Sequence, residues 1–251
     1  MQNEFFRGAI NPGDCVSNAW NLVKQNYGLF IAMVLVGGIL AGCIPCVSLF
    51  LAGPILAGFY HVFLMEMNGE PADFGALFKG FDVFVPTMVV GIILAIPEII
   101  GQGVRVSVDL ANFGLTREGA QSGEVALASG LVIFAFLFAI GVLVLTLVLR
   151  VSMFFTLPLI IERKMAVGDA IKLSASAAWG NLGGIILLFL LEVLLLIAGC
   201  LACIIGLLFV APIIYAANAF AYRQVFPKTD QTFQNVPPPP TAYDTGFGRG
   251  M

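Results

Sequence analysis

The chain carries an almost uninterrupted apolar run at residues 27–67, which reads YGLFIAMVLVGGILAGCIPCVSLFLAGPILAGFYHVFLMEM. No charged residue occurs in this run before Glu66. As one continuous helix the run would be roughly 60 Å long, about twice the thickness of the hydrocarbon core of a bilayer. The run therefore predicts two membrane-spanning helices joined by a reversal. Pro45 is the best place for the turn, because proline disrupts a helix interior.

Three further apolar segments extend this interpretation. Residues 180–226 are likewise too long for one span, and predict a second helical reversal near residues 200–203. Between the two runs, one span is expected at about 83–101. Another begins near Val125 and stays apolar to Ile161, with Arg150 interrupting it. The fold class predicted is an all-α integral membrane protein with six transmembrane helices.

The domain organisation follows from the same segments. A six-helix transmembrane domain is expected over residues 1–226, and residues 227–251 form a proline- and glycine-rich tail expected to be disordered in the cytoplasm. The parts of the transmembrane domain are repeat one at 13–67, a central hairpin at 83–161 and repeat two at 168–226.

Composition supports a membrane protein and excludes several functions. The 251 residues are 59% hydrophobic and 11% charged, whereas soluble proteins have about 25% charged residues. A net charge of -3 without a basic cluster argues against a nucleic-acid partner. One histidine and five cysteines leave little material for a metal-dependent or Ser-His-Asp hydrolase.

The distribution of basic residues predicts the orientation. With the N-terminus inside, the outer segments hold only Arg105 and Arg117. Positively charged residues concentrate in cytoplasmic segments of membrane proteins, so both termini are expected in the cytoplasm. The basic residues on the inner side are Arg7, Lys24, Lys79, Arg163, Lys164, Lys172, Arg223, Lys228 and Arg249.

Polar stretches outside the spans predict short helices on the membrane surface. Asp14 is expected to cap the first of these, and Asp169 to open a second that ends at Trp179. A third is expected at residues 74–81, where phenylalanine and leucine recur at helical spacing. Residues 102–124 form the only sizeable outer loop of this scheme; the alternation of valine with polar residues there leaves a short strand and a packed loop as alternatives.

An internal repeat is visible in uncommon residue types. Trp20, a Cys-x-x-Cys pair at 43–46 and Pro54 occur in the same order as Trp179, a second pair at 200–203 and Pro212. Both copies begin on the inner side, so a parallel duplication about an axis along the membrane normal is expected.

Four ionisable residues fall at predicted membrane depth, where such groups are costly and often functional. One interpretation is a proton or ion path, or a polar substrate pocket. The other is structural: Glu192 paired with Arg150 between neighbouring helices, or long side chains that reach to the membrane surface. The four intramembrane polar candidates are Glu192, Arg150, His61 and Glu98.

The two Cys-x-x-Cys pairs carry three alternatives. In a soluble intracellular protein they would indicate a four-thiolate zinc site. Here each falls at an apolar turn, where plain packing of a small thiol, a disulfide on the extracytoplasmic side and a shared metal all stay open. No cofactor or metal is expected, and the low-probability metal candidates are Cys43, Cys46, Cys200 and Cys203.

A longer motif carries a family resemblance. Arg150-Val-Ser-Met-Phe-Phe-Thr-Leu-Pro158 continues to Glu162, and Asp169 to Ser174 and Trp179-Gly-Asn181 follow. This pattern resembles a broad group of bacterial multi-pass proteins that includes the membrane domain attached to some glycerophosphodiester phosphodiesterases. The resemblance implies a bacterial inner-membrane address. It carries no catalytic residue, because the chain has no room for the phosphodiesterase barrel.

Two classes of function remain from the sequence. The first is a non-catalytic inner-membrane protein, acting as a scaffold, assembly factor or accessory subunit of a membrane complex. The alternative is a small transporter or channel that uses the intramembrane polar residues. Expected partners are membrane lipids and either another membrane protein or further copies of the chain.

Overall fold

The computed structural model of the chain describes residues 5–42, 45–117, 122–202 and 205–228. Within these residues every regular element is a helix, and six segments are long and apolar enough to cross a membrane. The prediction of an all-α chain with six candidate spans is confirmed. The elements are α1 (Pro12–Val23), the 3-10 helix η1 (Lys24–Asn26), α2 (Tyr27–Gly42), α3 (Pro45–Met67), the 3-10 helix η2 (Phe74–Val83), α4 (Phe84–Arg117), α5 (Ser122–Ser152), α6 (Thr156–Arg163), α7 (Val167–Gly180), α8 (Leu182–Leu201) and α9 (Ile205–Val225).

Both apolar runs reverse where the sequence predicts. The first ends α2 at Gly42 and begins α3 at Pro45, in the first helical position, where the missing N–H of proline has no helical partner to lose. The second run ends α8 at Leu201 and begins α9 at Ile205. The Pro54 and Pro212 rings sit inside α3 and α9.

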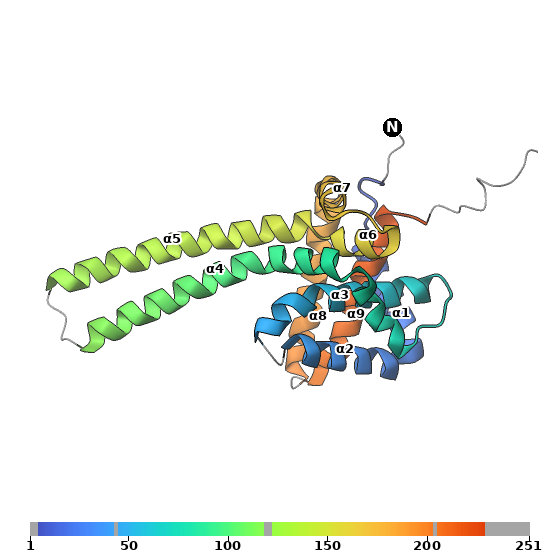
Figure 1. The fold of residues 1–251 in the computed structure, drawn as a ribbon, viewed down its shortest axis with the longest axis horizontal. Coiled ribbons are helices and arrows are strands. Elements are labelled where there is room, and N and C mark those ends of the chain that lie inside the picture. Colours follow the sequence, from blue (N-terminus) through green and yellow to red (C-terminus); the bar gives the residue numbers. More distant parts are fainter. Residues whose placement is uncertain (1–4, 43–44, 118–121, 203–204, 229–251) are drawn as a thin grey trace, which may run out of the picture.

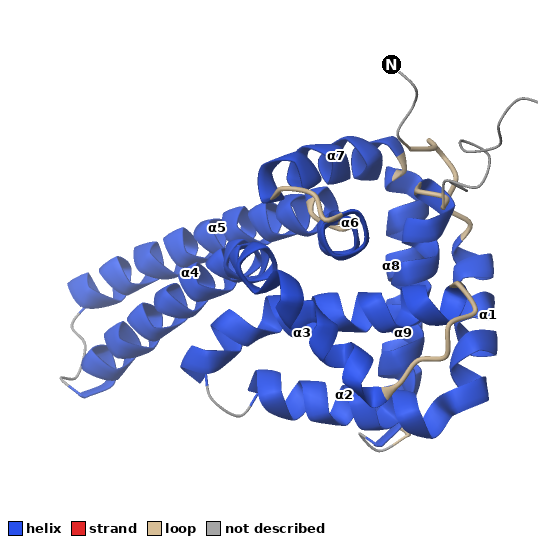
Figure 2. Ribbon diagram, turned by 45° about the vertical axis from the view of Figure 1, so that its right-hand side comes forward, coloured by secondary structure: helices blue, strands red, loops and turns tan. Residues whose placement is uncertain are grey.

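The strand or packed loop expected at 102–124 is wrong, because α4 continues through Arg117 and α5 begins at Ser122. The alternation of valine with polar residues suggested a strand. The polar residues at 102, 105 and 109 also recur at helical spacing, and the neighbouring helix provides the surface on which this part of α4 packs. Figures 1 and 2 show the resulting α4–α5 hairpin projecting from the rest of the molecule.

The long apolar segment from Val125 to Ile161 divides into two helices. Pro158 has no N–H to give the carbonyl four residues earlier, so a single helix cannot run through it unchanged. The Ser174 hydroxyl on α7 accepts from the Phe155 N–H (3.0 Å) and donates to the Ser152 carbonyl (2.8 Å), which satisfies the backbone at the break. The buried helix α6 then packs against α3.

The other helices form the body of the protein. Both ribbon views show α2 and α3 lying across α8 rather than alongside it (Figures 1 and 2). Aromatic rings fill the contacts between elements: Phe30 stacks on Phe63 with ring centroids 5.1 Å apart, and Phe59 stacks on Tyr215 at 4.9 Å. The N-terminal segment is held by Asn181, which accepts from the Ala9 N–H and donates to the Phe6 carbonyl, both at 2.9 Å.

The three expected surface helices differ from the prediction in where they begin or in helix type: α7 begins at Val167, with Asp169 in its first turn rather than opening it. Asn11, not Asp14, is the N-cap of α1, and its side-chain oxygen accepts from the Asp14 N–H. Asp14 lies in the first turn, where its carboxylate accepts from the Asn11 side chain at 2.7 Å. The 74–81 segment is a 3-10 helix, which Asp73 caps by accepting from the Ala76 N–H at 2.7 Å.

Glycine allows α3 to lie directly against α4 and η2. A Cβ on Gly53 would overlap the Thr87 carbonyl of α4, and one on Gly58 would overlap the Leu77 carbonyl of η2. Backbone atoms occupy the space that a side chain would need, so neither residue tolerates a methyl group without separation of the helices.

We therefore expect Gly53→Ala and Gly58→Ala each to lower the free energy of unfolding by about 1–3 kcal/mol, the usual cost of overpacking. Gly38→Ala on α2 is the matched control. No atom lies within 4 Å of its Cβ position, and alanine favours a helix over glycine by up to about 1 kcal/mol. Unfolding in mixed micelles measures all three; equal stability of Gly58→Ala and Gly38→Ala would contradict the close backbone contact.

Candidate functional site: a polar stripe on the α4–α5 hairpin

Four polar residues of α4 lie on one side of the helix. Glu98, Gln102, Arg105 and Asp109 are separated by four, three and four positions, the spacing that places side chains on one helical face. All four are exposed and line a groove between α4 and α5 with a volume of about 610 Å³. We call these four residues the polar stripe.

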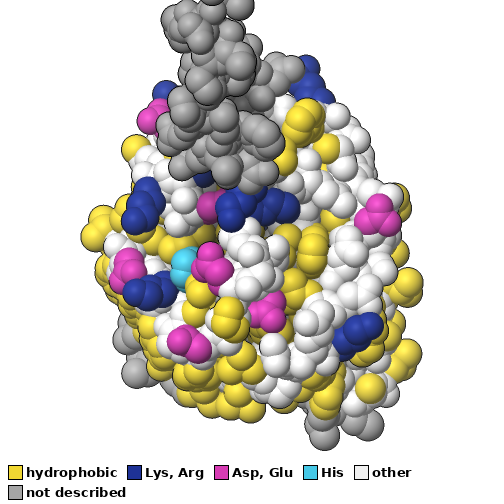
Figure 3. Space-filling model, turned by 90° about the vertical axis from the view of Figure 1, so that its right-hand side faces the viewer, with side chains coloured by type: hydrophobic (Ala, Val, Ile, Leu, Met, Phe, Trp, Pro, Cys, Tyr) yellow, Lys and Arg dark blue, Asp and Glu magenta, His cyan; other side chains and the backbone are white. Residues whose placement is uncertain are grey.

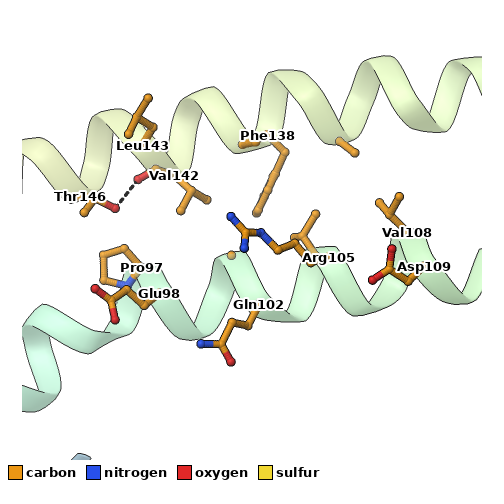
Figure 4. Close-up of a pocket in the computed structure, with 14 residues that line it drawn as sticks. Pro97, Glu98, Gln102, Arg105, Val108, Asp109, Phe138, Val142, Leu143 and Thr146 are labelled. Carbon is orange, nitrogen blue, oxygen red and sulfur yellow. Dashed lines mark hydrogen bonds between the residues drawn. The ribbon is translucent and has the colours of Figure 1, made fainter. Parts of the chain in front are cut away.

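The groove has mixed walls. Figure 4 shows the Arg105 guanidinium lying between the two helices below Phe138, whereas Gln102 points away from α5. On the α5 side, Thr146 donates to the Val142 carbonyl of its own helix at 2.7 Å, so its hydroxyl is already used. The groove is therefore polar along α4 and mostly apolar along α5.

Arg150 pairs with Glu98 and not with Glu192, so the pairing expected from sequence is wrong. The Arg150 Nη2 atom lies 2.8 Å from Glu98 Oε1, and both side chains are more than half exposed. Consecutive position along the chain suggested Glu192 as the partner. The antiparallel packing of α4 on α5 instead brings Glu98, 52 positions away in sequence, to the end of α5.

The polar stripe lies level with a strongly apolar part of α5. The Cβ position of Gly101 on α4 is 3.8 Å from a Val142 methyl group on α5, and the groove lining joins α4 from residue 97 to 109 with α5 from 135 to 146. No residue in the most apolar 18-residue stretch from Phe134 onward is buried. Charged groups of α4 and bare apolar side chains of α5 therefore share the same positions along the hairpin.

Arg105 and Asp109 are the two charges of the stripe without an ion-pair partner in the described part of the chain. Placing arginine or aspartate at the centre of a membrane helix costs about 2.5–3.5 kcal/mol by insertion scales. Sequence reasoning assigned Arg105 to an outer loop and did not recognise the stripe. Its four-three-four spacing was the available signal.

Glu192 lies in a different place, between α8 and α9. It is 9% exposed, and the Asn218 side chain of α9 lies beside it. Its Oε1 atom and Asn218 Oδ1 have no further hydrogen-bond partner among the described residues. Glu192 does not line the groove beside the polar stripe, the cavity beside Arg223 or the apolar hollow beside Phe134.

His61 lies near a charged surface rather than beside Glu192. It is half-buried on α3, with Glu70, Lys79 and Asp82 within electrostatic reach. Figure 3 shows acidic and basic side chains gathered around the histidine on the end of the molecule that faces away from the α4–α5 hairpin.

A second ionic cluster joins α6 to α9 and was not predicted. Glu162 accepts from the Tyr222 hydroxyl at 2.6 Å and pairs with Arg223 at 2.8 Å, with both charged side chains mostly buried. Arg223 also lines a cavity of about 470 Å³ together with Asn68 and Lys228. Glu162 and Arg223 each lie in the last turn of an apolar helix. This position is the only feature of the sequence that could have indicated the pair.

The cysteine alternatives stay open. Cys200 is exposed and free, whereas Cys43, Cys203 and the side chain of Cys46 lie outside the described residues. Among the described residues, no group of three or more histidine, cysteine or acidic residues is placed to hold a metal ion.

We expect a double-mutant cycle to separate the two pairings of Arg150. Glu98→Gln and Arg150→Gln should show a coupling of at least about 0.5 kcal/mol in the free energy of unfolding, because the two charges touch. Glu192→Gln and Arg150→Gln should be additive within about 0.5 kcal/mol. Unfolding in mixed micelles provides the measurement, and strong coupling of Arg150 to Glu192 with none to Glu98 would contradict the observed ion pair.

Comparison with known proteins finds no relative on which these assignments could be based. No known protein family, no curated protein and no solved structure matches the chain. The resemblance of residues 150–181 to the membrane domain of glycerophosphodiester phosphodiesterases therefore stays a prediction. The function has to be inferred from the residues of the chain itself.

Proposed function

We propose that this chain is a non-catalytic, multi-pass inner-membrane protein, acting as a scaffold, assembly factor or accessory subunit, and that the α4–α5 hairpin is its binding surface. The observation that carries the proposal is the position of the polar stripe beside the bare apolar surface of α5. A surface of this kind is incompletely solvated by lipid alone, because Arg105 and Asp109 need polar partners there.

The apolar surface of α5 supports binding within the bilayer. Phe134, Phe136, Leu137 and Leu143 are each more than half exposed. In water such a surface would be a strong aggregation or interaction site. In the membrane, lipid covers the apolar part, and a second helix that brings polar groups to the stripe covers the rest.

The membrane placement proposed here has both termini in the cytoplasm. The charged end of the molecule, with His61, Lys79 and Arg223, then faces the cytoplasm, and the residues between α4 and α5 lie outside. In the same placement α1, η2 and α7 lie on the inner membrane surface. The half-exposed Trp20 and Trp179 support this position, because tryptophan favours the membrane interface.

The internal repeat is part of this proposal. In each copy a short helix is followed by a two-helix reversal: α1, α2 and α3 in the first, and α7, α8 and α9 in the second. The helices α2 and α3 lie across the direction of α8. The two copies are therefore rotated relative to each other and do not simply lie side by side. Superposition of 13–67 on 168–226 is the direct test.

A small transporter or channel is the second candidate. The observation in its favour is Glu192, a buried carboxyl group with one oxygen atom unpartnered among the described residues. Intramembrane carboxyl groups commonly bind protons or cations. Proton flux into pyranine-loaded liposomes that is lost in Glu192→Gln would favour this candidate over the scaffold.

We expect a cysteine introduced at Ser122 to react with a membrane-impermeant thiol reagent in intact cells, and Lys79→Cys to be protected, because the two residues lie on opposite sides of the proposed membrane. Labelling after permeabilisation is the control for accessibility of Lys79→Cys. The reverse pattern would invert the orientation.

The binding surface is tested by site-specific photocrosslinking in native membranes. We expect a photoreactive phenylalanine analogue at Phe138, which lines the groove, to form an adduct with one defined membrane protein that mass spectrometry identifies. Phe189 on α8 is the matched control: it is 55% exposed but has no polar stripe beside it. The same analogue there should give lipid adducts only.

Arg105→Gln should reduce the Phe138 protein adduct at least fivefold, since the stripe loses its unpaired cation. Lipid adducts alone at Phe138, equal to those at Phe189, would contradict the proposed function.

A further inference from the structure

Four charged residues belong to the polar stripe or touch it. Glu98 and Asp109 are acidic, and Arg105 and Arg150 are basic. Glu98 and Arg150 neutralise each other at 2.8 Å, which leaves one cation and one anion, Arg105 and Asp109, to be satisfied from outside the described chain. A partner that binds the stripe would therefore complement it best with one group of each sign at the same depth.

Moving the bilayer along the hairpin does not separate the polar stripe from the apolar surface of α5. If the bilayer moves so that Arg105 and Asp109 reach water, the apolar surface of α5 around Phe134 and Leu137 leaves the lipid with them, since these segments are level in the hairpin. If the bilayer covers α5, the two charges are in lipid. A protein surface against the stripe satisfies both helices.

We propose that this partner is a second copy of the chain, whose polar stripe faces the first across a two-fold axis along the membrane normal. The inference rests on the proposed function and names the partner of the same binding surface. Two copies with one membrane orientation have parallel α4 helices. Arg105 and Asp109 are separated by about 6 Å along the helix axis, so Arg105 of each copy reaches Asp109 of the other.

This arrangement uses the same residues on both copies, as a two-fold interface requires. It forms two reciprocal ion pairs, so every unpaired charge of the stripe is satisfied. The groove also contains small residues, Gly101, Ala135 and Ala139, which let a neighbouring membrane helix approach closely. A different partner would need an unrelated stripe with the same two charges at the same separation, which a second copy has by identity.

Charge exchange between copies tests the pairing in native membranes. Arg105→Asp makes the two positions both acidic, and Asp109→Arg makes them both basic. Resonance energy transfer between copies with donor and acceptor fluorescent proteins at the C-terminus measures association. We expect each variant to associate with itself at least tenfold more weakly than the natural chain, and the two variants mixed together to associate within about twofold of it.

Restoration in the mixture supports the proposal, because a folding defect of a single variant is not corrected by another defective copy. Lys79→Asp, an equal charge change on η2 away from the hairpin, is the control and should associate like the natural chain. Undiminished self-association of both variants overturns the proposal, and so does a mixture that stays as weak as each variant alone.

Identification of the Phe138 photoadduct separates this inference from the proposed function. An adduct between two copies of the chain supports both. An adduct with a different membrane protein overturns the second-copy proposal and leaves the proposed function intact. Lipid adducts alone overturn both.

Discussion

The antiparallel register of α4 against α5 determines which side chains of this protein meet lipid. It places Glu98 beside Arg150 and leaves Arg105 and Asp109 level with the most apolar part of α5. Each helix alone has a segment long and apolar enough to cross a membrane. Packed in this register, they form a surface with charge on one side and bare apolar side chains on the other, and a bilayer does not solvate that surface completely.

The register is possible because the hairpin leaves the body of the protein at a fixed point. Pro158 removes a backbone N–H just after the break between α5 and α6, and Ser174 of α7 satisfies the backbone at that break. On the other helix of the hairpin, α4, the absence of a side chain at Gly53 lets α3 lie against the α4 backbone. These contacts anchor the base of the hairpin, while the part beyond them makes few contacts with the body (Figure 1).

The ionisable groups differ in how completely the chain provides them with hydrogen bonds and ion pairs. Glu162 has the Tyr222 hydroxyl and Arg223 as partners, so it joins α6 to α9 as a satisfied cluster. Glu192 has only Asn218, and Arg105 and Asp109 have no ion-pair partner among the described residues. A binding surface or an ion site needs polar groups whose hydrogen bonds or ion pairs are incomplete within the protein, because the ligand provides the remaining interaction. The exposed position of the stripe favours a binding surface, whereas burial of Glu192 favours a structural or proton-binding group.

Several features were set by the sequence itself, because they depend on local composition and length. Apolar runs too long for one span had to reverse, and Pro45 placed the first turn; the six candidate spans follow from the same arithmetic. The identity of the partners did not follow, because distance along the chain does not measure distance in space: Arg150 met Glu98 and not Glu192. The polar stripe was not predicted for the same reason. The sequence alone suggested that residues 102–109 belong to a polar loop, because it does not show that α5 packs beside them. In the tertiary structure that segment is a helix packed beside α5, and its polar residues form an exposed surface along the groove between the two helices.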